Sequence, residues 1–390
     1  MYNIFMELKD EKGVFPEKKK EKFKASNATG SELSKCIGSL ISILVLAVFL
    51  GIFELLSDNR ETMNAISESI SMPLRTILAY ASSVFPFSVA EVMVLGVFLF
   101  VALIPLILVF FAVKYRKRFF IRTFRFLLGV AVAVLTGFNL MNILWNANYR
   151  ADGFSERSGI YPQKSDVETL YRVTGIFAKK CADYSRNIHR DKDGGYSADL
   201  NEVFDNSKYL YGKLEEEYPF LKAPHFRPKK VYFSEGLSRL RTTGVAFPFT
   251  GEANINVDRP DSFIPVTIAH EIAHQRSVAS EDEANFLAII SCIESDIPEY
   301  RYSGALSAYS YLSSQLAKAD YGLYKKAASH LDSGSKYDLR EENDYWKKYE
   351  KSRIADTGDR IYDGYLKSQG EELGIKSYGA VVDLLISYYG

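Results

Sequence analysis

Two histidines four residues apart, His270 and His274, with Glu271 directly after the first, form the most chemically informative segment of the chain. On a helix, residues at positions i and i+4 share one face, so both imidazoles can bind one zinc ion. In hydrolases with the pattern H-E-x-x-H, the glutamate takes a proton from the attacking water. The segment therefore predicts a Zn²⁺ site on a helix, with Glu271 as general base.

A zinc site of this class needs a third protein ligand, and the acidic segment that follows His274 can supply it. Glu281, Asn285 and Ala288 share one face of the helix expected there. Glu283 points about 200° away from Glu281 on an ideal helix, so the two carboxylates cannot bind one ion without distortion. Glu281 is therefore the preferred ligand and Glu283 the alternative, while Asn285 is predicted to orient a ligating histidine.

Residues 244–257, which precede the histidines, have the β-branched and aromatic content of strands, with Gly and Pro between them. An extended strand beside a zinc helix can pair with a substrate backbone. Glu252 and Asn254 are then candidates for substrate contact. An ordinary sheet strand fits the same pattern, and both interpretations stay open.

Three apolar runs precede this region, at residues 37–56, 92–113 and 126–145. A helix needs roughly 20 apolar residues to cross a hydrocarbon layer about 30 Å thick, and each run has that length. The sequence therefore predicts three transmembrane helices within residues 36–146, after a lysine-rich tail at residues 1–35.

Basic residues are distributed unevenly around these runs. The tail and the 114–125 link are rich in Lys and Arg, whereas the link at residues 57–91 carries only Arg60 and Arg75. The positive-inside rule then places the N-terminus and the 114–125 link in the cytoplasm. A multi-pass protein of the cytoplasmic membrane is expected, with residues 147–390 on its outer side.

Residues 147–390 are expected to form one extracytoplasmic domain. Helical spacing dominates, and strand-like segments occur at residues 230–234 and 244–257. The three cysteines lie far apart without a C-x-x-C pair, which argues against a cysteine zinc site and a disulfide framework. The predicted fold is three transmembrane helices plus a mainly α (α+β) zincin-like soluble domain with a small sheet.

The segment A-H-E-I-A-H-Q at 269–275, followed by E-D-E-A-N-F-L-A from Glu281, resembles gluzincin metallopeptidases. In that class a glutamate on a following helix completes the zinc site, which implies this role for Glu281. The E-x-x-A-N piece is similar to an E-x-x-A-D of membrane-embedded proteases, with Asn285 in place of the usual Asp.

Over nearly its full length the chain is similar to the bacterial domain of unknown function 3810 family. The matching segments are W-N-A-N-Y-R at 145–150, F-P-F-T-G-E-A-N at 247–254, Y-D-G-Y-L-K-S-Q-G at 362–370 and S-Y-G-A-V-V-D-L-L at 377–385. Because the third segment belongs to this resemblance, Tyr362 and Tyr365 become candidates for stabilising a tetrahedral oxyanion.

These features together predict a membrane-anchored zinc metalloendopeptidase that acts on peptide or protein substrates. The lipid bilayer is a second expected partner. Basic and acidic residues are equal in number, at 48 each, so nucleic acid is not expected. Two alternatives remain, a zinc-binding sensor without hydrolytic activity and a structural membrane protein, and the sequence predicts no oligomeric state.

Overall fold

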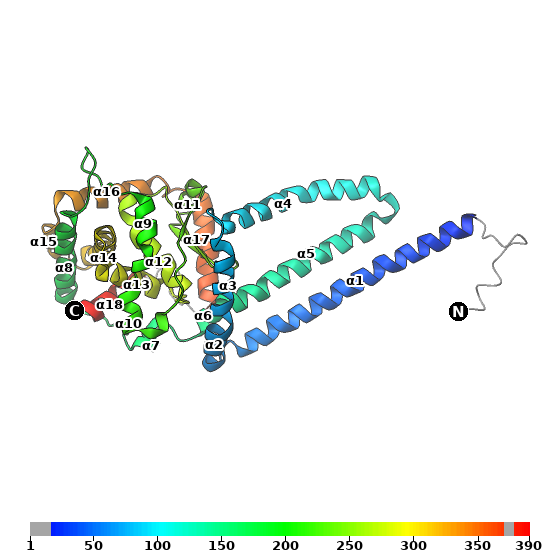
Figure 1. Cartoon of the computed structure of the whole chain (residues 1–390), viewed down its shortest axis with the longest axis horizontal. Helices are drawn as coiled ribbons and strands as arrows, with labels where there is room; N and C mark the ends of the chain where they lie inside the picture. Colours follow the sequence, from blue (N-terminus) through cyan, green and yellow to red (C-terminus); the bar gives the residue numbers. More distant parts are fainter. Residues whose placement is uncertain (1–16, 370–377) are drawn as a thin grey trace, which may run out of the picture. The chain divides into compact units, whose positions relative to one another are not determined.

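The computed structural model of the chain describes residues 17–369 and 378–390 (Figure 1). Two compact units are present. The first consists of Met1–Leu55 with Gly96–Leu140, and the second of Leu56–Leu95 with Met141–Gly390. Each unit therefore contains two separate stretches of the chain.

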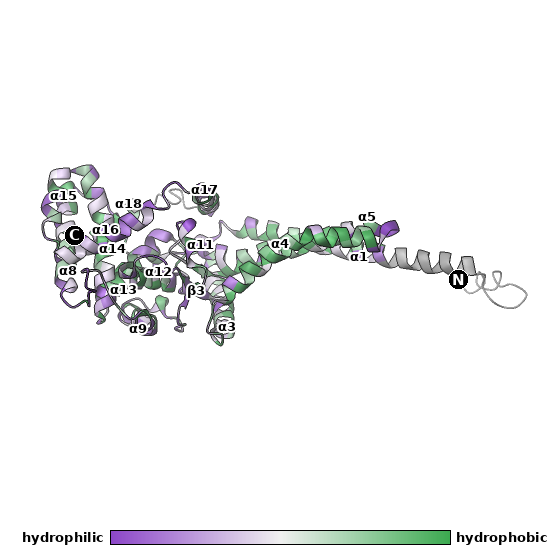
Figure 2. Cartoon of the chain, turned by 90° about the horizontal axis from the view of Figure 1, so that it is seen from above, coloured by the Kyte–Doolittle hydropathy of each residue, from purple (hydrophilic) through white to green (hydrophobic). Residues whose placement is uncertain are grey.

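The first unit is built from α1 (Glu17–Leu56), most of α4 (Val89–Lys114) and most of α5 (Phe119–Met141). These helices are hydrophobic along most of their described length (Figure 2). Three helical stretches are long and apolar enough to cross a membrane, at Glu32–Leu56, Val89–Lys114 and Arg116–Arg150. The prediction of three membrane-spanning helices is confirmed to this extent.

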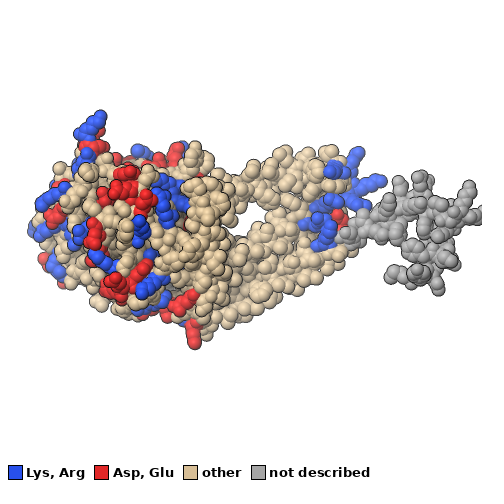
Figure 3. All heavy atoms as spheres, in the orientation of Figure 1, with Lys and Arg blue, Asp and Glu red and all other residues tan. Residues whose placement is uncertain are grey.

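Charged side chains of the first unit gather at the turn between α4 and α5, which contains η2 (Arg116–Arg118) (Figure 3). Glu32 of α1 accepts hydrogen bonds from Arg122 and Arg125 of α5, at 3.1 and 2.5 Å. Two of the basic residues in this region, Arg122 and Arg125, thus share one acidic partner.

The second unit begins with α2 (Arg60–Ile66), η1 (Ser67–Ser71) and α3 (Met72–Ser83), which run on without a break. The sequence analysis placed this link in the transmembrane region, whereas the structure packs it with the C-terminal residues. Hydrogen bonds from α3 account for the difference. Arg75 and Ser82 donate to the backbone carbonyls of His274 and Thr250, each at 3.0 Å.

The sheet of this unit has three short strands in the order β1-β3-β2. β3 (Glu252–Ile255) lies in the centre, parallel to β1 (Lys229–Lys230) and antiparallel to β2 (Gly244–Phe247). The strand expected at residues 230–234 is shorter than predicted, because the chain turns into α11 (Ser234–Arg239). β2 forms one edge of the sheet.

Helices make up the rest of the unit, and α12 (Ile264–Gln275) is buried in its middle against α13, α14, β2 and β3. Apolar side chains on several faces of α12 explain this position. The remaining helices are η3 (Asn142–Asn146), α6 (Ala147–Arg150), α7 (Phe154–Ser158), α8 (Val167–Ser185), α9 (Leu200–Asn206), η4 (Ser207–Tyr209), α10 (Gly212–Glu217), η5 (Pro219–Leu221), η6 (Asp261–Phe263), α13 (Glu281–Glu294), α14 (Pro298–Ala319), α15 (Tyr321–Ala328), α16 (Ser333–Lys347), α17 (Arg353–Ser368) and α18 (Tyr378–Tyr389).

Candidate metal centre

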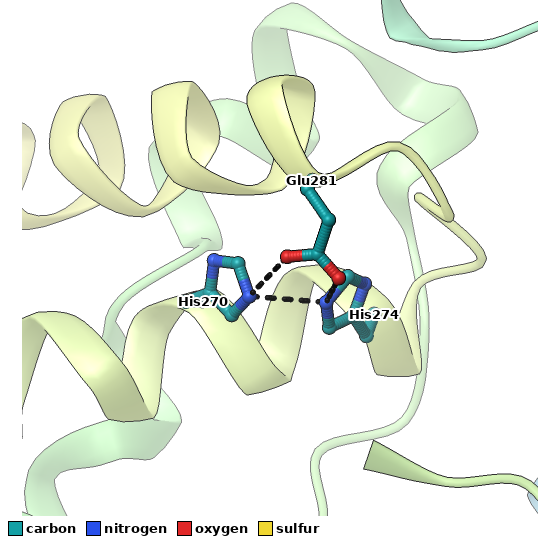
Figure 4. Close-up of side chains that lie close together, drawn as sticks. All are labelled: His270, His274 and Glu281. Carbon is teal, nitrogen blue, oxygen red and sulfur yellow. Dashed lines mark hydrogen bonds and ion pairs between the residues drawn. The ribbon is translucent and has the colours of Figure 1, made fainter. Parts of the chain in front are cut away.

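Three side chains from α12 and α13 converge on one point (Figure 4). The Nε2 atoms of His270 and His274 lie 3.0 Å apart. The carboxylate of Glu281 is 3.4 Å from the Nε2 atom of His270 and 3.7 Å from that of His274. One potential ligand atom from each residue lies within 4.8 Å of the others, so the structure brings these three predicted residues together.

The turn between the two helices makes this convergence possible. Ser277 adopts a left-handed backbone conformation with φ of 67°, directly after the end of α12. The amide of Val278 donates to the carbonyl of Ala273 at 3.2 Å, which folds the chain back over the last turn of the helix. Glu281 is the first residue of α13 and therefore comes to lie over the two histidines.

His274 is held in one tautomer by this turn. Its Nδ1 atom lies 2.7 Å from the carbonyl oxygen of Val278, which can only accept a hydrogen bond, so Nδ1 carries the proton. Burial, together with the neighbouring His270, lowers the pKa of His274 to about 4. The neutral ring therefore presents a bare lone pair on Nε2 to the centre of the cluster.

The charges of the other two side chains complement each other. Burial opposes ionisation of Glu281, but the hydrogen bond from His270 and the electrostatic interactions with both histidine side chains outweigh it, and the pKa of Glu281 falls to about 2. Burial also opposes a charge on His270, yet Glu281 raises the pKa of that histidine above its ordinary value. Glu281 is therefore a carboxylate at neutral pH.

These donors fit a zinc ion. Zinc bonds of about 2.0–2.1 Å in a tetrahedral site place neighbouring ligand atoms roughly 3.4 Å apart. The two histidine nitrogens are 3.0 Å apart, and each lies 3.4 or 3.7 Å from one of the two Glu281 oxygens, which is around that value. Two imidazole nitrogens and one carboxylate oxygen are also a donor set that zinc binds, with a fourth position left open.

Glu271 is buried next to this cluster, and its Oε2 atom has no hydrogen-bond partner among the described residues. Burial raises the pKa of Glu271 to about 8, against the opposing charge of His270. Gly244 of β2 provides the space for this carboxylate, because a Cβ atom at position 244 would lie 2.4 Å from its Oε1 atom. Sequence analysis did not single out Gly244.

Glu283 lies apart from the cluster and has a different role. Its two carboxylate oxygens accept hydrogen bonds from the backbone amides of Phe154 and Ser155, at 2.7 and 2.8 Å. These amides open α7, where a carboxylate is favoured by the unpaired N–H groups and the helix dipole. Asn285 donates to the backbone carbonyl of Glu281 at 2.7 Å, and its side chain also raises the pKa of His270.

Glu252 and Asn254, the candidates for substrate contact, are buried and occupied elsewhere. Glu252 accepts from the amides of Val89 and Ala90 at the start of α4 and pairs with Lys229 at 2.5 Å. Asn254 accepts from the Ser88 hydroxyl at 2.6 Å. Both side chains therefore fasten the beginning of α4 to the sheet and lie outside the three-residue cluster.

The two tyrosines of the C-terminal resemblance separate in the structure. The Tyr362 hydroxyl donates to the carboxylate of Glu281 at 2.5 Å, and Tyr365 donates to the Asn146 side chain at 2.7 Å. Tyr362 is therefore part of the cluster's surroundings. Tyr365 instead joins α17 to the end of the third long helical stretch.

Arg75 of α3 is a component of the site that sequence analysis used only as a topology marker. Its guanidinium donates to the His274 carbonyl at 3.0 Å and to the Ser277 hydroxyl. The guanidinium also lies over the Trp145 ring, whose edge-on contact with His274 has a centroid distance of 5.5 Å. A lone charge in an otherwise uncharged stretch was the available signal for a buried role.

The chain belongs to the family described as "Protein of unknown function (DUF3810)", whose model matches residues 67–386. The matched range contains the three-residue cluster and also η1 and α3, which carry Arg75. No match was found among curated proteins or among solved structures.

Proposed function

We propose that this protein is a membrane-anchored, zinc-dependent metallopeptidase with a zincin-like catalytic unit. One observation carries the proposal. A zinc-compatible set of His270, His274 and Glu281 lies beside a buried carboxylate, Glu271, that has an unpartnered oxygen. A buried carboxyl oxygen without a hydrogen-bond partner is energetically costly, and a water molecule held at the cluster would supply that partner.

Residues of this chain account for the proton transfers of the proposed hydrolysis. A bound zinc ion would supply a Lewis acid and make water acidic enough to lose a proton near neutral pH. The positive charge of a bound zinc ion would favour the carboxylate form of Glu271, which would then accept that proton as the water attacks a peptide carbonyl and deliver it to the leaving amine. The Tyr362 hydroxyl, which donates to Glu281, would donate to the oxyanion that develops, and its position next to a potential metal ligand supports this role.

Orientation in the membrane follows from the distribution of basic residues. Those of the 114–125 link belong on the cytoplasmic side, and the candidate metal centre then belongs outside. Peptides and proteins on the outer side of the cytoplasmic membrane are accordingly the proposed substrate class. The same arrangement makes the bilayer a permanent partner.

The experiment measures zinc content and peptide hydrolysis of the full-length chain in detergent. The full chain is needed because Leu56–Leu95 belongs to the same compact unit as the site. We expect about one zinc per chain from the donor set, and loss of zinc and hydrolysis in His270→Ala. Glu271→Gln is the matched variant, since it should retain zinc and lose hydrolysis.

Each outcome separates the alternatives. Zinc in the wild type without hydrolysis of any peptide in a broad library would favour a zinc-binding sensor. A folded wild type without zinc would refute the proposal and leave a structural membrane protein.

A further inference from the structure

The helix α3 has an unusual distribution of polar and apolar residues. Its inward positions, together with Ser71 just before it, are polar or small, and Ser71, Arg75, Ala79 and Ser82 are each at most 5% exposed. In a water-soluble protein the inward face of a surface helix is apolar and the outward face is polar. The inward face of α3 is the reverse of this pattern.

Apolar side chains occupy that outward face. Ile70, Leu74, Ile77 and Val84 follow one another at spacings of three to seven residues, and their exposed fractions run from 41 to 74%. Such spacing places them along one side of a helix. A continuous exposed apolar patch of this kind marks a surface that contacts another molecule or a membrane.

The same stretch lacks outward charge. From Ser69 to Ala90 the only charged residue is Arg75, which is buried against His274 and Ser277. A docking surface for a soluble protein usually has a polar and charged rim. An uncharged stretch of this length favours contact with the hydrocarbon of a membrane over contact with a soluble protein.

The two ends of this segment indicate that the hydrocarbon is that of the lipid bilayer. Three residues separate the candidate span that ends at Leu56 from α2, and five separate α3 from the candidate span that starts at Val89. A chain of this length cannot carry α2 and α3 far from the bilayer surface. Both ends of the segment are thus tethered beside lipid.

Aromatic side chains near the start of α4 agree with this location. Glu91, in the first turn of α4, accepts hydrogen bonds from the amides of Tyr232 and Phe233, at 3.0 and 2.8 Å. Both rings are exposed, by 85 and 55%, as are those of Phe85 and Phe87. Tyrosine and other aromatic residues gather at the level of lipid headgroups in membrane proteins.

We propose that the segment from Ile70 to Val84, which contains α3, lies on the bilayer surface, with the side chains of Ile70, Leu74, Ile77 and Val84 in lipid and Arg75 directed toward the candidate metal centre. An interfacial helix of this kind buries its apolar face about 5–10 Å into the boundary of headgroups and acyl chains. The inference does not require zinc or hydrolysis. It places α3, which contacts the backbone of His274 through Arg75, at the membrane surface.

The test uses the full-length chain in nanodiscs with a fluorophore on Ile77→Cys. Tyr321→Cys in α15 is the matched control, because Tyr321 is 62% exposed and Ile77 is 63% exposed. Cys36, Cys181 and Cys292 are buried, so the unchanged chain gives the labelling background. Quenching by lipids that carry a nitroxide near the headgroup is measured, together with the rate of reaction with a charged maleimide.

At an interfacial depth we expect the label at position 77 to lose about half of its emission and the maleimide reaction to slow about tenfold relative to position 321. Equal quenching and equal reactivity at the two positions would overturn the proposal. Protection from maleimide without lipid quenching would also overturn it, since a protein surface or a second copy would then cover α3. Neither readout depends on metal or activity, so failure here differs from failure of the proposed function.

Discussion

α12 and α3 both direct polar side chains toward the interior of the second unit, but for different purposes. α12 presents His270 and His274 to the candidate metal centre and Glu271 beside it, and apolar residues on its other faces pack in the core. α3 presents Arg75 to the backbone of α12 and leaves its apolar face exposed. A buried polar residue can thus be a potential metal ligand, as in α12, or can hold a backbone segment in place, as Arg75 of α3 does.

Experiments can test this difference between α12 and α3. Changes in α12 and α13 should remove the metal or the proton acceptor. Changes in α3 should weaken metal binding indirectly, because α3 contributes no ligand to the described cluster.

The largest expected effect separates two carboxylates on α13. Glu281→Ala should abolish zinc binding, because it removes one of three protein ligands. Glu283→Ala should retain zinc but lower the free energy of unfolding by about 1–3 kcal/mol, because two backbone amides lose their acceptor. Elemental analysis and denaturant unfolding measure these outcomes, and the reverse pattern would make Glu283 the ligand.

A smaller effect is expected at Gly244, which touches the proton acceptor and no metal ligand. Gly244→Ala introduces a Cβ that must displace the Glu271 carboxylate. Displacement of a reacting group by about 1 Å costs on the order of 10²-fold in rate, so kcat should fall to that extent. Zinc content should stay unchanged, and unaltered kcat would mean that the carboxylate of Glu271 does not need its present position.

The smallest effect is expected in α3. Arg75→Met removes the donor to the His274 carbonyl, and zinc affinity should fall by about 10-fold, at the lower end for residues that support metal ligands. Arg75→Lys, which keeps the charge, should restore part of that affinity. Competition with a chelator measures the affinity, and a loss of thermal stability without any change in affinity would show that α3 supports only the fold.

Local sequence was sufficient for those parts of the site that depend on spacing within a helix. The i and i+4 positions of His270 and His274 follow from helical geometry alone. The same geometry separates Glu281 from Glu283, which the structure places at different partners. The three long apolar helices were equally predictable, because length and composition decide whether a helix can cross a bilayer.

Only the tertiary structure decided which distant segments surround the site. Arg75, Gly244 and Tyr362 come from different helices and strands, and no spacing in the sequence links them to α12. Glu252 and Asn254 hold the start of α4 through Val89 and Ser88. These partners lie more than 160 positions away in the sequence, so no local pattern links them. Helical period is a local property that the sequence carries by itself, whereas the partner of a buried polar group is fixed only when the chain folds.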